Sequence, residues 1–285
     1  MTRQPKGRLI NGILILDKPT GMSSNHALQR VKRMFGARKA GHTGSLDPLA
    51  TGLLPICLGE ATKFSQFLLD ADKRYQTTAQ LGVRTDSSDA DGKVVETKPC
   101  EHITVTDVEA QLPQFRGLIS QVPSMFSALK HQGQPLYKLA RAGKTVAVKP
   151  RQVTIHNLEL LSFKHSQVQM DISCTKGTYI RSIVEDLGLA LDCGAHVAQL
   201  RRLQAGPFVA EQMVTLEDLQ GIIDEATQGQ VVEAGQWPDI TPAFPRLDQL
   251  LIPADTAVLT LNAVQLPAHE IEALQQGKVI DHATE

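Results

Sequence analysis

Residues 153–174 read VTIHNLELLSFKHSQVQMDISC. Apolar and polar side chains alternate along 153–160 and again along 168–174. A period of two is typical of a β-strand that buries one face, and two such runs close together in the chain predict a strand pair. Residues 75–81, YQTTAQL, show the same alternation and predict a third strand.

The other segments do not alternate regularly between strand and helix. Apolar residues predict a buried strand at 9–16, LINGILIL, and a further strand is expected at 199–209. Apolar residues at helical spacing predict helices in four segments: 24–36, 61–69, 180–191 and 216–223. Because regular βαβ units are missing, this order predicts the α+β class, with a mixed, largely antiparallel sheet and flanking helices.

The length and composition fit a folded, membrane-free protein. The chain has 285 residues, of which 42% are apolar, enough for one large domain or a domain with a small appendix. No run of 18 apolar residues predicts a membrane span, and the first ten residues, MTRQPKGRLI, lead into no secretion signal. The four cysteines lie far apart without a CxxC pair, so we expect a reduced, cytoplasmic protein without a zinc site.

Charge is distributed unevenly along the chain. Residues 1–204 hold 27 basic and 17 acidic side chains, a net of +10, whereas 205–285 hold 2 and 13, a net of −11. The positive charge is densest at 1–46 and at 110–158, and the second stretch has no acidic residue. One such run is more often a solvated surface, but two that flank a chemical motif favour a nucleic-acid surface.

Two segments fit neither a helix nor a strand. Residues 114–150 contain Gly and Pro among basic residues, and a loop of this length predicts an arm or lid that closes on an anionic partner. Residues 236–253 hold four prolines and predict a linker. The last segment, 254–285, is expected to form a short strand at 257–261 and a short helix at 270–276, too little for a core of its own.

Residues 41–52, GHTGSLDPLATG, form the most unusual segment. Four of the twelve are Gly or Pro, so the backbone turns tightly and can approach a ligand closely. Asp47 lies between an apolar residue and a proline, which frees its side chain to point into a cleft. Taken alone, an Asp before Pro is more often a turn initiator, and His42 is more often a structural histidine.

The longer string GHTGSLDPLATGLLP (41–55) resembles the catalytic motif of the TruB family of pseudouridine synthases. Four more strings follow that family's order: ILDKPTGMSS (15–24), KRY (73–75), KGTYIRSIVEDLG (176–188) and AHVAQLRRLQAGPF (195–208). Together they span residues 1–210, and their order makes chance an insufficient explanation. The resemblance implies the pseudouridine-synthase fold, with a catalytic domain at 1–235.

The same resemblance implies the reaction and its residues. Uridine 55 in the T-loop of tRNA would be flipped out and isomerised to pseudouridine without a cofactor, a metal or an obligate protein partner. A monomer is expected on a separate ground, because no self-complementary apolar stripe stands out in the sequence. Asp47 would act on the sugar as nucleophile or in forming a glycal, with Arg181 as its ionic partner. Tyr75 would stack on the base and remove the C5 proton, Tyr179 and Leu200 would wall the uracil pocket, and His42 would pack against the extruded nucleotide. Taken singly, each of these side chains except Asp47 is more often a core or surface residue than a functional one.

The resemblance also implies where RNA binds. Residues 114–150 would grip the T-arm, and six basic residues there and just beyond would contact its backbone: Lys130, Lys138, Arg141, Lys144, Lys149 and Arg151. Lys18 would position the Asp47 loop or touch a phosphate. Members of the family usually end in a β-rich RNA-binding domain of the PUA type, of which 254–285 would be an incomplete part.

Other functions remain open at this level. A non-catalytic protein that binds or folds tRNA on the same scaffold is the main alternative. A guide-RNA-dependent catalytic subunit is less consistent with a short chain, and an aspartate-nucleophile hydrolase would need a second placed carboxylate or a metal. Asp86, Asp89 and Asp91-Gly92 lack the further ligands of a calcium loop and predict a turn before a strand at Val94.

Overall fold

The strand pair predicted at 153–174 lies inside the main sheet of the protein. The computed structural model describes residues 7–127, 129–230, 239–259 and 261–280. Strand β10 (Arg151–Lys164) pairs antiparallel with β11 (Gln167–Cys174), and β11 pairs with β4 (Lys73–Leu81) on its other side. The alternating pattern therefore predicted three adjacent strands correctly.

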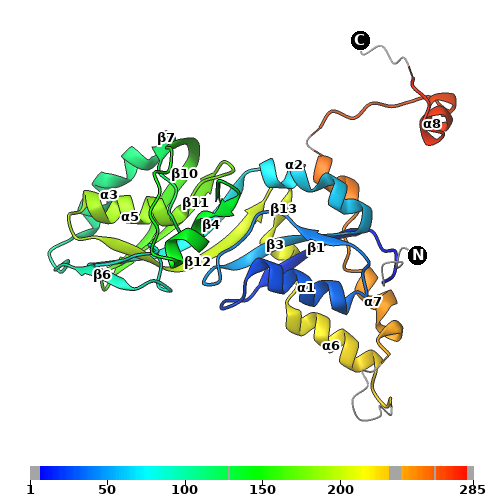
Figure 1. The fold of residues 1–285 in the computed structure, drawn as a ribbon, viewed down its shortest axis with the longest axis horizontal. Coiled ribbons are helices and arrows are strands. Elements are labelled where there is room, and N and C mark those ends of the chain that lie inside the picture. Colours follow the sequence, from blue (N-terminus) through cyan, green and yellow to red (C-terminus); the bar gives the residue numbers. More distant parts are fainter. Residues whose placement is uncertain (1–6, 128, 231–238, 260, 281–285) are drawn as a thin grey trace.

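The sheet has nine strands, and seven of them follow the order β1-β3-β12-β4-β11-β10-β7. The remaining bounds are β1 Gly12–Lys18, β2 Ala40–His42, β3 Thr51–Leu58, β7 Gly117–Gln121, β12 Ala195–Ala205 and β13 Phe208–Val209. Among these strands only β12 and β3 pair in parallel, at Arg201 and Arg202. The sheet is thus mixed and largely antiparallel, and β12 crosses between the two lobes of the elongated molecule (Figure 1).

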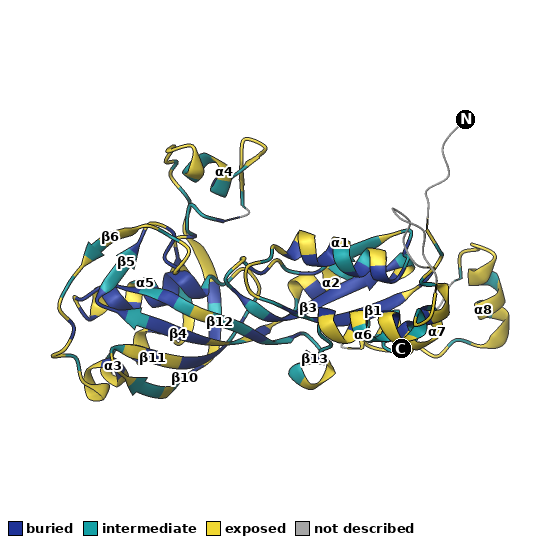
Figure 2. Cartoon of the chain, turned by 90° about the horizontal axis from the view of Figure 1, so that it is seen from below, coloured by how far each residue is buried: buried dark blue, intermediate teal, exposed yellow. Residues whose placement is uncertain are grey.

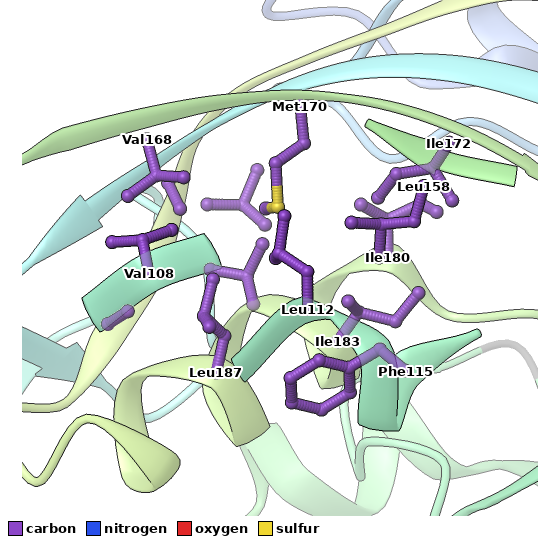
Figure 3. Close-up of a cluster of buried hydrophobic side chains, with 14 of the residues drawn as sticks. Val108, Leu112, Phe115, Leu158, Val168, Met170, Ile172, Ile180, Ile183 and Leu187 are labelled. Atoms are coloured by element: carbon purple, nitrogen blue, oxygen red, sulfur yellow. The ribbon is translucent and has the colours of Figure 1, made fainter. Parts of the chain in front are cut away.

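Each lobe has its own hydrophobic core. In one lobe α3 (Val105–Gln111) and α5 (Ile180–Ala190) cover β4, β10, β11 and β12, and Figure 3 shows Met170 of β11 among side chains of both helices. In the other lobe α1 (Ser24–Met34) and α6 (Leu216–Ala226) cover β1 and β3. Tyr75 and Leu200 pack against both cores, so the junction of the lobes lies at β4 and β12.

Residues 13–16 of strand β1 are all apolar because both faces of the strand are buried there. Leu14 and Leu16 belong to the core under α1, whereas Ile13 and Ile15 face a third core on the other side of the sheet. That third core is closed by a 3-10 turn (Gly59–Phe64) and α2 (Ser65–Asp70), at the position of the helix predicted for 61–69. A continuous apolar run, rather than alternation, is the expected signature of such a strand.

The segment 114–150 is more regular than the sequence indicated. A 3-10 turn (Leu112–Phe115) leads into β7, which pairs with β10 as the edge strand of the main sheet. Only residues 122–150, hereafter the arm, leave the sheet. The arm carries β8 (Lys130–His131), β9 (Gln134–Pro135) and α4 (Leu136–Arg141), and Figure 2 shows α4 standing off the body of the molecule.

The described part of the C-terminal segment begins at Asp239. A 3-10 turn (Thr241–Ala243) and α7 (Phe244–Asp248) bury Ala243 and Leu247 in the core under α1, so 239–248 is packed structure rather than a free linker. The strand expected at 257–261 is wrong, because a 3-10 turn occupies Ala254–Val258. The helix expected at 270–276 is present as α8 (Ala268–Gln275). None of the described helices is long and apolar enough to span a membrane.

Candidate active site

Asp47 lies on the loop between β2 and β3, and this loop is held on both sides of the residue. Before it, the Leu46 N–H donates to the Ser24 hydroxyl at 2.8 Å, and that hydroxyl donates to the Leu46 carbonyl at 3.0 Å. After it, the Pro48 carbonyl accepts a hydrogen bond from the Gly21 N–H at 2.8 Å. The carboxylate is therefore presented by a fixed backbone, as a group that must meet a substrate in one orientation requires.

Lys18, at the end of β1, is buried beneath this loop. Its ammonium donates to the carbonyls of Pro19, Met22 and Pro48 at 2.8, 2.7 and 3.4 Å. Burial lowers the pKa of Lys18 to about 8, against the opposing effect of the Asp47 charge. The residue is 0% exposed, so the prediction that Lys18 touches the RNA backbone is wrong, and the role of positioning the Asp47 loop remains.

Arg202 is a second buried cation that the sequence did not single out. It is 1% exposed, and its guanidinium donates from Nε to the Leu53 carbonyl at 2.7 Å and from Nη2 to the Gly44 carbonyl at 3.1 Å. These bonds tie β12 to the start of β3 and to the Asp47 loop. The sequence could have indicated this residue, because Arg202 lies two positions after Leu200 on one strand and the two side chains therefore share a face of the sheet.

Arg181, in the first turn of α5, brings the catalytic motif and the arm together. Its Nη2 lies 3.0 Å from Asp47 Oδ2 and donates to the Phe126 carbonyl of the arm at 2.8 Å. Its Nη1 lies 3.4 Å from Asp89 Oδ2 and donates to the Ser87 carbonyl at 2.9 Å. The guanidinium is a rigid planar fork, so four partners on three chain segments fix where its charge lies.

The Asp47 carboxylate experiences opposing electrostatic effects. Burial raises its pKa above the ordinary value, Arg181 and Lys18 favour the charged form, and the nearby carboxylates Asp89 and Asp91 disfavour it. The Asp47 side chain is nevertheless 43% exposed, because it faces a cavity although protein surrounds it on other sides. A carboxylate that is poorly solvated yet held next to a fixed cation is suited to attack on, or stabilisation of, a developing positive centre.

The cavity beside Asp47 has a volume of about 830 Å³. Its lining comes from the first turn of α1, the Asp47 loop, the turn at 86–93 and the arm, and it includes His42, Arg181, Tyr137 and Arg141. Cavities of about 300–1,000 Å³ are typical of sites for small organic groups. The arm therefore forms one wall of the space that the Asp47–Arg181 pair faces.

Tyr75 and Leu200 line the junction of the two cores. Tyr75 on β4 is directly opposite Arg202 on β12, and Leu200 is opposite Thr77, so all four side chains share one face of the sheet. Burial raises the pKa of Tyr75, while the Arg202 charge acts in the opposite direction. Leu200 lines a separate groove of about 430 Å³ rather than the Asp47 cavity, so the structure places it next to the cavity and not in its wall.

Tyr179 and His42 come from different elements near the ion pair: His42 lines the Asp47 cavity, and Tyr179 is close enough to interact with the charges of Arg181 and Asp47 but is not among the lining residues. Tyr179 is the residue before α5, and both its N–H and its carbonyl bond the Gln121 side-chain amide, at 3.0 and 3.2 Å. His42 lies on β2 and lines the cavity, and its Nδ1 is buried without a hydrogen-bond partner among the described residues. Burial lowers the pKa of His42 and raises that of Tyr179, so both side chains favour their neutral forms.

The remaining predicted RNA contacts lie on or beside the arm, and all of them are exposed: Lys130, Lys138, Arg141, Lys144, Lys149 and Arg151. Lys138 and Arg141 lie on α4, and Arg141 stacks on Tyr137 with its guanidinium carbon 5.7 Å from the ring centre. The turn at Asp86, Asp89 and Asp91 leads into β6 (Val94–Thr97) as predicted. Within the described ranges, no group of three His, Cys, Asp or Glu side chains is placed to hold a metal ion.

Comparison with known proteins gives a consistent result. The family model described as "TruB family pseudouridylate synthase (N terminal domain)" matches residues 32–180, and "tRNA pseudouridylate synthase B C-terminal domain" matches 181–259. A tRNA pseudouridine synthase B of Vibrio cholerae is 52% identical over 280 residues, 98% of this chain and 86% of that protein. The same enzyme of Shewanella denitrificans is 54% identical over 280 residues, 98% of this chain and 85% of that protein.

A solved structure shares the fold at lower identity. The structure titled "Crystal Structure of a Cbf5-Nop10-Gar1 Complex" contains a chain that is 29% identical, with a TM-score of 0.64, and the match covers 87% of this chain and 61% of that one.

Proposed function

This chain belongs to the TruB family of pseudouridylate synthases, and from that premise we propose that it converts uridine 55 in the T-loop of tRNA to pseudouridine. The observation that carries the proposal is the Asp47–Arg181 ion pair, which faces a cavity walled by a basic arm. The cavity supplies room for a flipped nucleotide, and the arm supplies positive charge for the surrounding RNA.

The reaction exchanges one bond to the sugar for another. The bond between N1 of the base and C1′ breaks, a bond between C5 and C1′ forms, C5 loses its proton and N1 ends protonated, so no atom is gained or lost overall. We propose that Asp47 acts at the sugar, either by bonding to C1′ or by assisting loss of a sugar proton to a glycal. Both routes need the carboxylate in its charged form, which Arg181 and Lys18 favour.

Tyr75 is proposed to hold the detached base and to take the C5 proton. Its ring lies at the junction of the two lobes, and the Arg202 guanidinium on the neighbouring strand favours the phenolate, the form that would accept this proton and become the phenol. Tyr179 is proposed to limit how the base can turn, Leu200 to support Tyr75 from the neighbouring strand, and His42 to replace the stacking that the nucleotide loses when it leaves the RNA.

We propose that the enzyme acts as a monomer, because the described residues of a single chain form the Asp47–Arg181 pair, the cavity beside it and the basic arm. We propose that the enzyme works in the cytoplasm without an obligate protein partner. Activity that is proportional to enzyme concentration over a wide dilution range, together with a monomeric mass by light scattering, would support this. Loss of specific activity on dilution would contradict it.

The experiment that tests the function uses an unmodified tRNA transcript. Wild-type protein is incubated with it, and pseudouridine is mapped by carbodiimide treatment and primer extension. We expect one stop, at position 55. Asp47→Asn should bind the transcript with near wild-type affinity and form no product, because the amide keeps the shape and loses the charge. Asp224→Asn, on the exposed side of α6, is the matched control and should be fully active.

The non-catalytic alternative makes a different prediction. A protein that only binds or folds tRNA would leave position 55 unmodified and would tolerate Asp47→Asn. The four-partner placement of Arg181 beside Asp47 supports the enzyme, because a binding protein has no need for a carboxylate fixed next to a polyanion. Product formation by Asp47→Asn at the wild-type rate would contradict the catalytic assignment.

A further inference from the structure

The turn at residues 85–92, hereafter the Asp89 turn, delivers a carboxylate to Arg181. Asp89 is 5% exposed, and its two oxygens have separate tasks. Oδ1 accepts from the Ser87 hydroxyl at 2.6 Å and from the Asp91 N–H at 3.2 Å, whereas Oδ2 lies 3.4 Å from Arg181 Nη1. Whether the Asp89 carboxylate points at Arg181 therefore depends on the backbone conformation of this turn.

One residue of the turn has a conformation that an ordinary side chain disfavours. Ser88 has a φ of +61° and is 4% exposed. The left-handed region is disfavoured for a residue that has a Cβ atom, so surrounding contacts must hold Ser88 there. On the backbone, the Ser88 carbonyl accepts from the Val197 N–H of β12 at 3.0 Å.

The side-chain contact to Ser88 comes from α5. Glu185 Oε2 accepts a hydrogen bond from the Ser88 hydroxyl at 2.6 Å, and its Oε1 accepts from Arg84 Nη2 at 3.1 Å. Arg84 in turn donates to Glu96 Oε2 at 3.0 Å, so it remains paired if Glu185 is removed. Glu185 lies four residues after Arg181, which puts both side chains on the face of α5 toward the Asp89 turn.

We propose that Glu185 is a positioning residue for the reaction: by bonding Ser88 it holds the Asp89 turn in the strained conformation that aims Asp89 at Arg181. Helix α5 thus holds the turn at two points one helical turn apart. Arg181 contacts Asp89 and the Ser87 carbonyl, and Glu185 contacts the Ser88 hydroxyl. Glu185 lines no part of the Asp47 cavity, so its effect on catalysis is through Ser88 and Asp89. The inference rests on the proposed function of this site.

Its test is a rescue experiment. Glu185→Ala should lower the single-turnover rate of pseudouridine formation at saturating tRNA about tenfold, the effect of about 1.4 kcal/mol on a rate constant. The dissociation constant for tRNA should change less than twofold. In Ser88→Gly/Glu185→Ala the rate should return to within about threefold of wild type, because glycine adopts a positive φ without cost. Glu96→Ala removes the other carboxylate that Arg84 holds and should leave the rate unchanged.

The outcomes separate the inference from the function on which it rests. A wild-type protein that makes no pseudouridine contradicts the proposed function itself. With an active wild type, an unchanged rate in Glu185→Ala, or an equal loss in the double variant and in Glu185→Ala, overturns the role of Glu185. If Glu185→Ala does not fold, Ser88→Ala removes the same hydrogen bond without changing α5. Ser88→Ala should then lower the single-turnover rate as well, and an unchanged rate would overturn the inference.

Discussion

At the scale of single residues, some neighbours of Asp47 favour its charged form and others oppose it. Burial raises its pKa, with Asp89 and Asp91 adding to this, and Arg181 with Lys18 opposes it. A raised pKa means that the carboxylate takes up a proton at a higher pH than a free aspartate. Activity should therefore be lost as the pH falls through that raised value, and should be constant above it until another group titrates.

The pH at which activity is lost on the acidic side should depend on Arg181. Replacing Arg181 by Lys keeps one positive charge and loses the planar fork that reaches Asp47, Asp89 and two carbonyls. The charged form of Asp47 is then less favoured, so we expect the acidic fall in the single-turnover rate to move to higher pH. The measurement is that rate from pH 5 to pH 8 for both proteins. A fall at the same pH in both would show that another group controls it.

The residues proposed for catalysis are easier to pick out in the sequence than the residues that hold them in place. Asp47 and Arg181 lie in recognisable strings, and the structure pairs them at 3.0 Å. Glu185 and Arg202 also lie in such strings and Gln121 does not, but nothing marks any of the three as an anchor, because a polar side chain looks the same in a sequence whether it faces solvent or a buried carbonyl. Lys18 was in a recognised string, but its depth under the Asp47 loop depends on how three distant segments pack.

At the scale of elements, the start of α5 depends on the edge strand β7. Gln121, the last residue of β7, is 2% exposed, and its amide bonds the N–H and the carbonyl of Tyr179. Next to it, the Ser182 hydroxyl donates to the Val122 carbonyl at 3.2 Å. The arm is thus joined at its base to the helix turn that carries Arg181.

We expect Gln121→Ala to lower the free energy of unfolding by about 1–3 kcal/mol, because it leaves the Tyr179 N–H without its partner and removes one bond to the Tyr179 carbonyl, which still accepts from the Ser182 and Ile183 N–H groups. The single-turnover rate should also fall, since Tyr179 and Arg181 share that turn. Urea denaturation and the tRNA assay measure the two effects. Gln114→Ala, at an exposed position that bonds only Gln111, is the control and should change neither. A variant as stable as wild type would contradict this account.

Elements with a buried face were predicted well, and those without one were not. Strands β4, β10 and β11 alternate because one side of each faces the core under α5. Strand β7 was missed because four of its five residues are not buried, so no period of two exists to detect. The strand expected at 257–261 was wrong because the apolar residues there do not share a buried face. Ala257 is buried, whereas Leu259 and Leu261 are 70% and 53% exposed.

At the scale of the whole molecule, the uneven charge of the sequence matches the placement of the site. The basic half of the chain contains the Asp47 loop and the arm, and the acidic half contains α6, α7 and α8. Six cations on and beside the arm are exposed. Exposed cations that meet RNA phosphates act by displacing counterions, so their contribution should depend on salt in a measurable way.

The salt dependence of tRNA binding should therefore report on the arm. Replacing Lys138, Lys144 and Lys149 by Ala should weaken binding and reduce the slope of log affinity against log salt by about 2, because each phosphate that is no longer neutralised lowers the slope by about 0.7–0.9. Arg141 is kept because it lines the Asp47 cavity. A control with Lys63, Lys164 and Arg246 replaced removes the same charge away from the arm. Equal slopes for the two variants would mean that the arm binds no more phosphate than the rest of the surface, and the gripping role of 122–150 would fail.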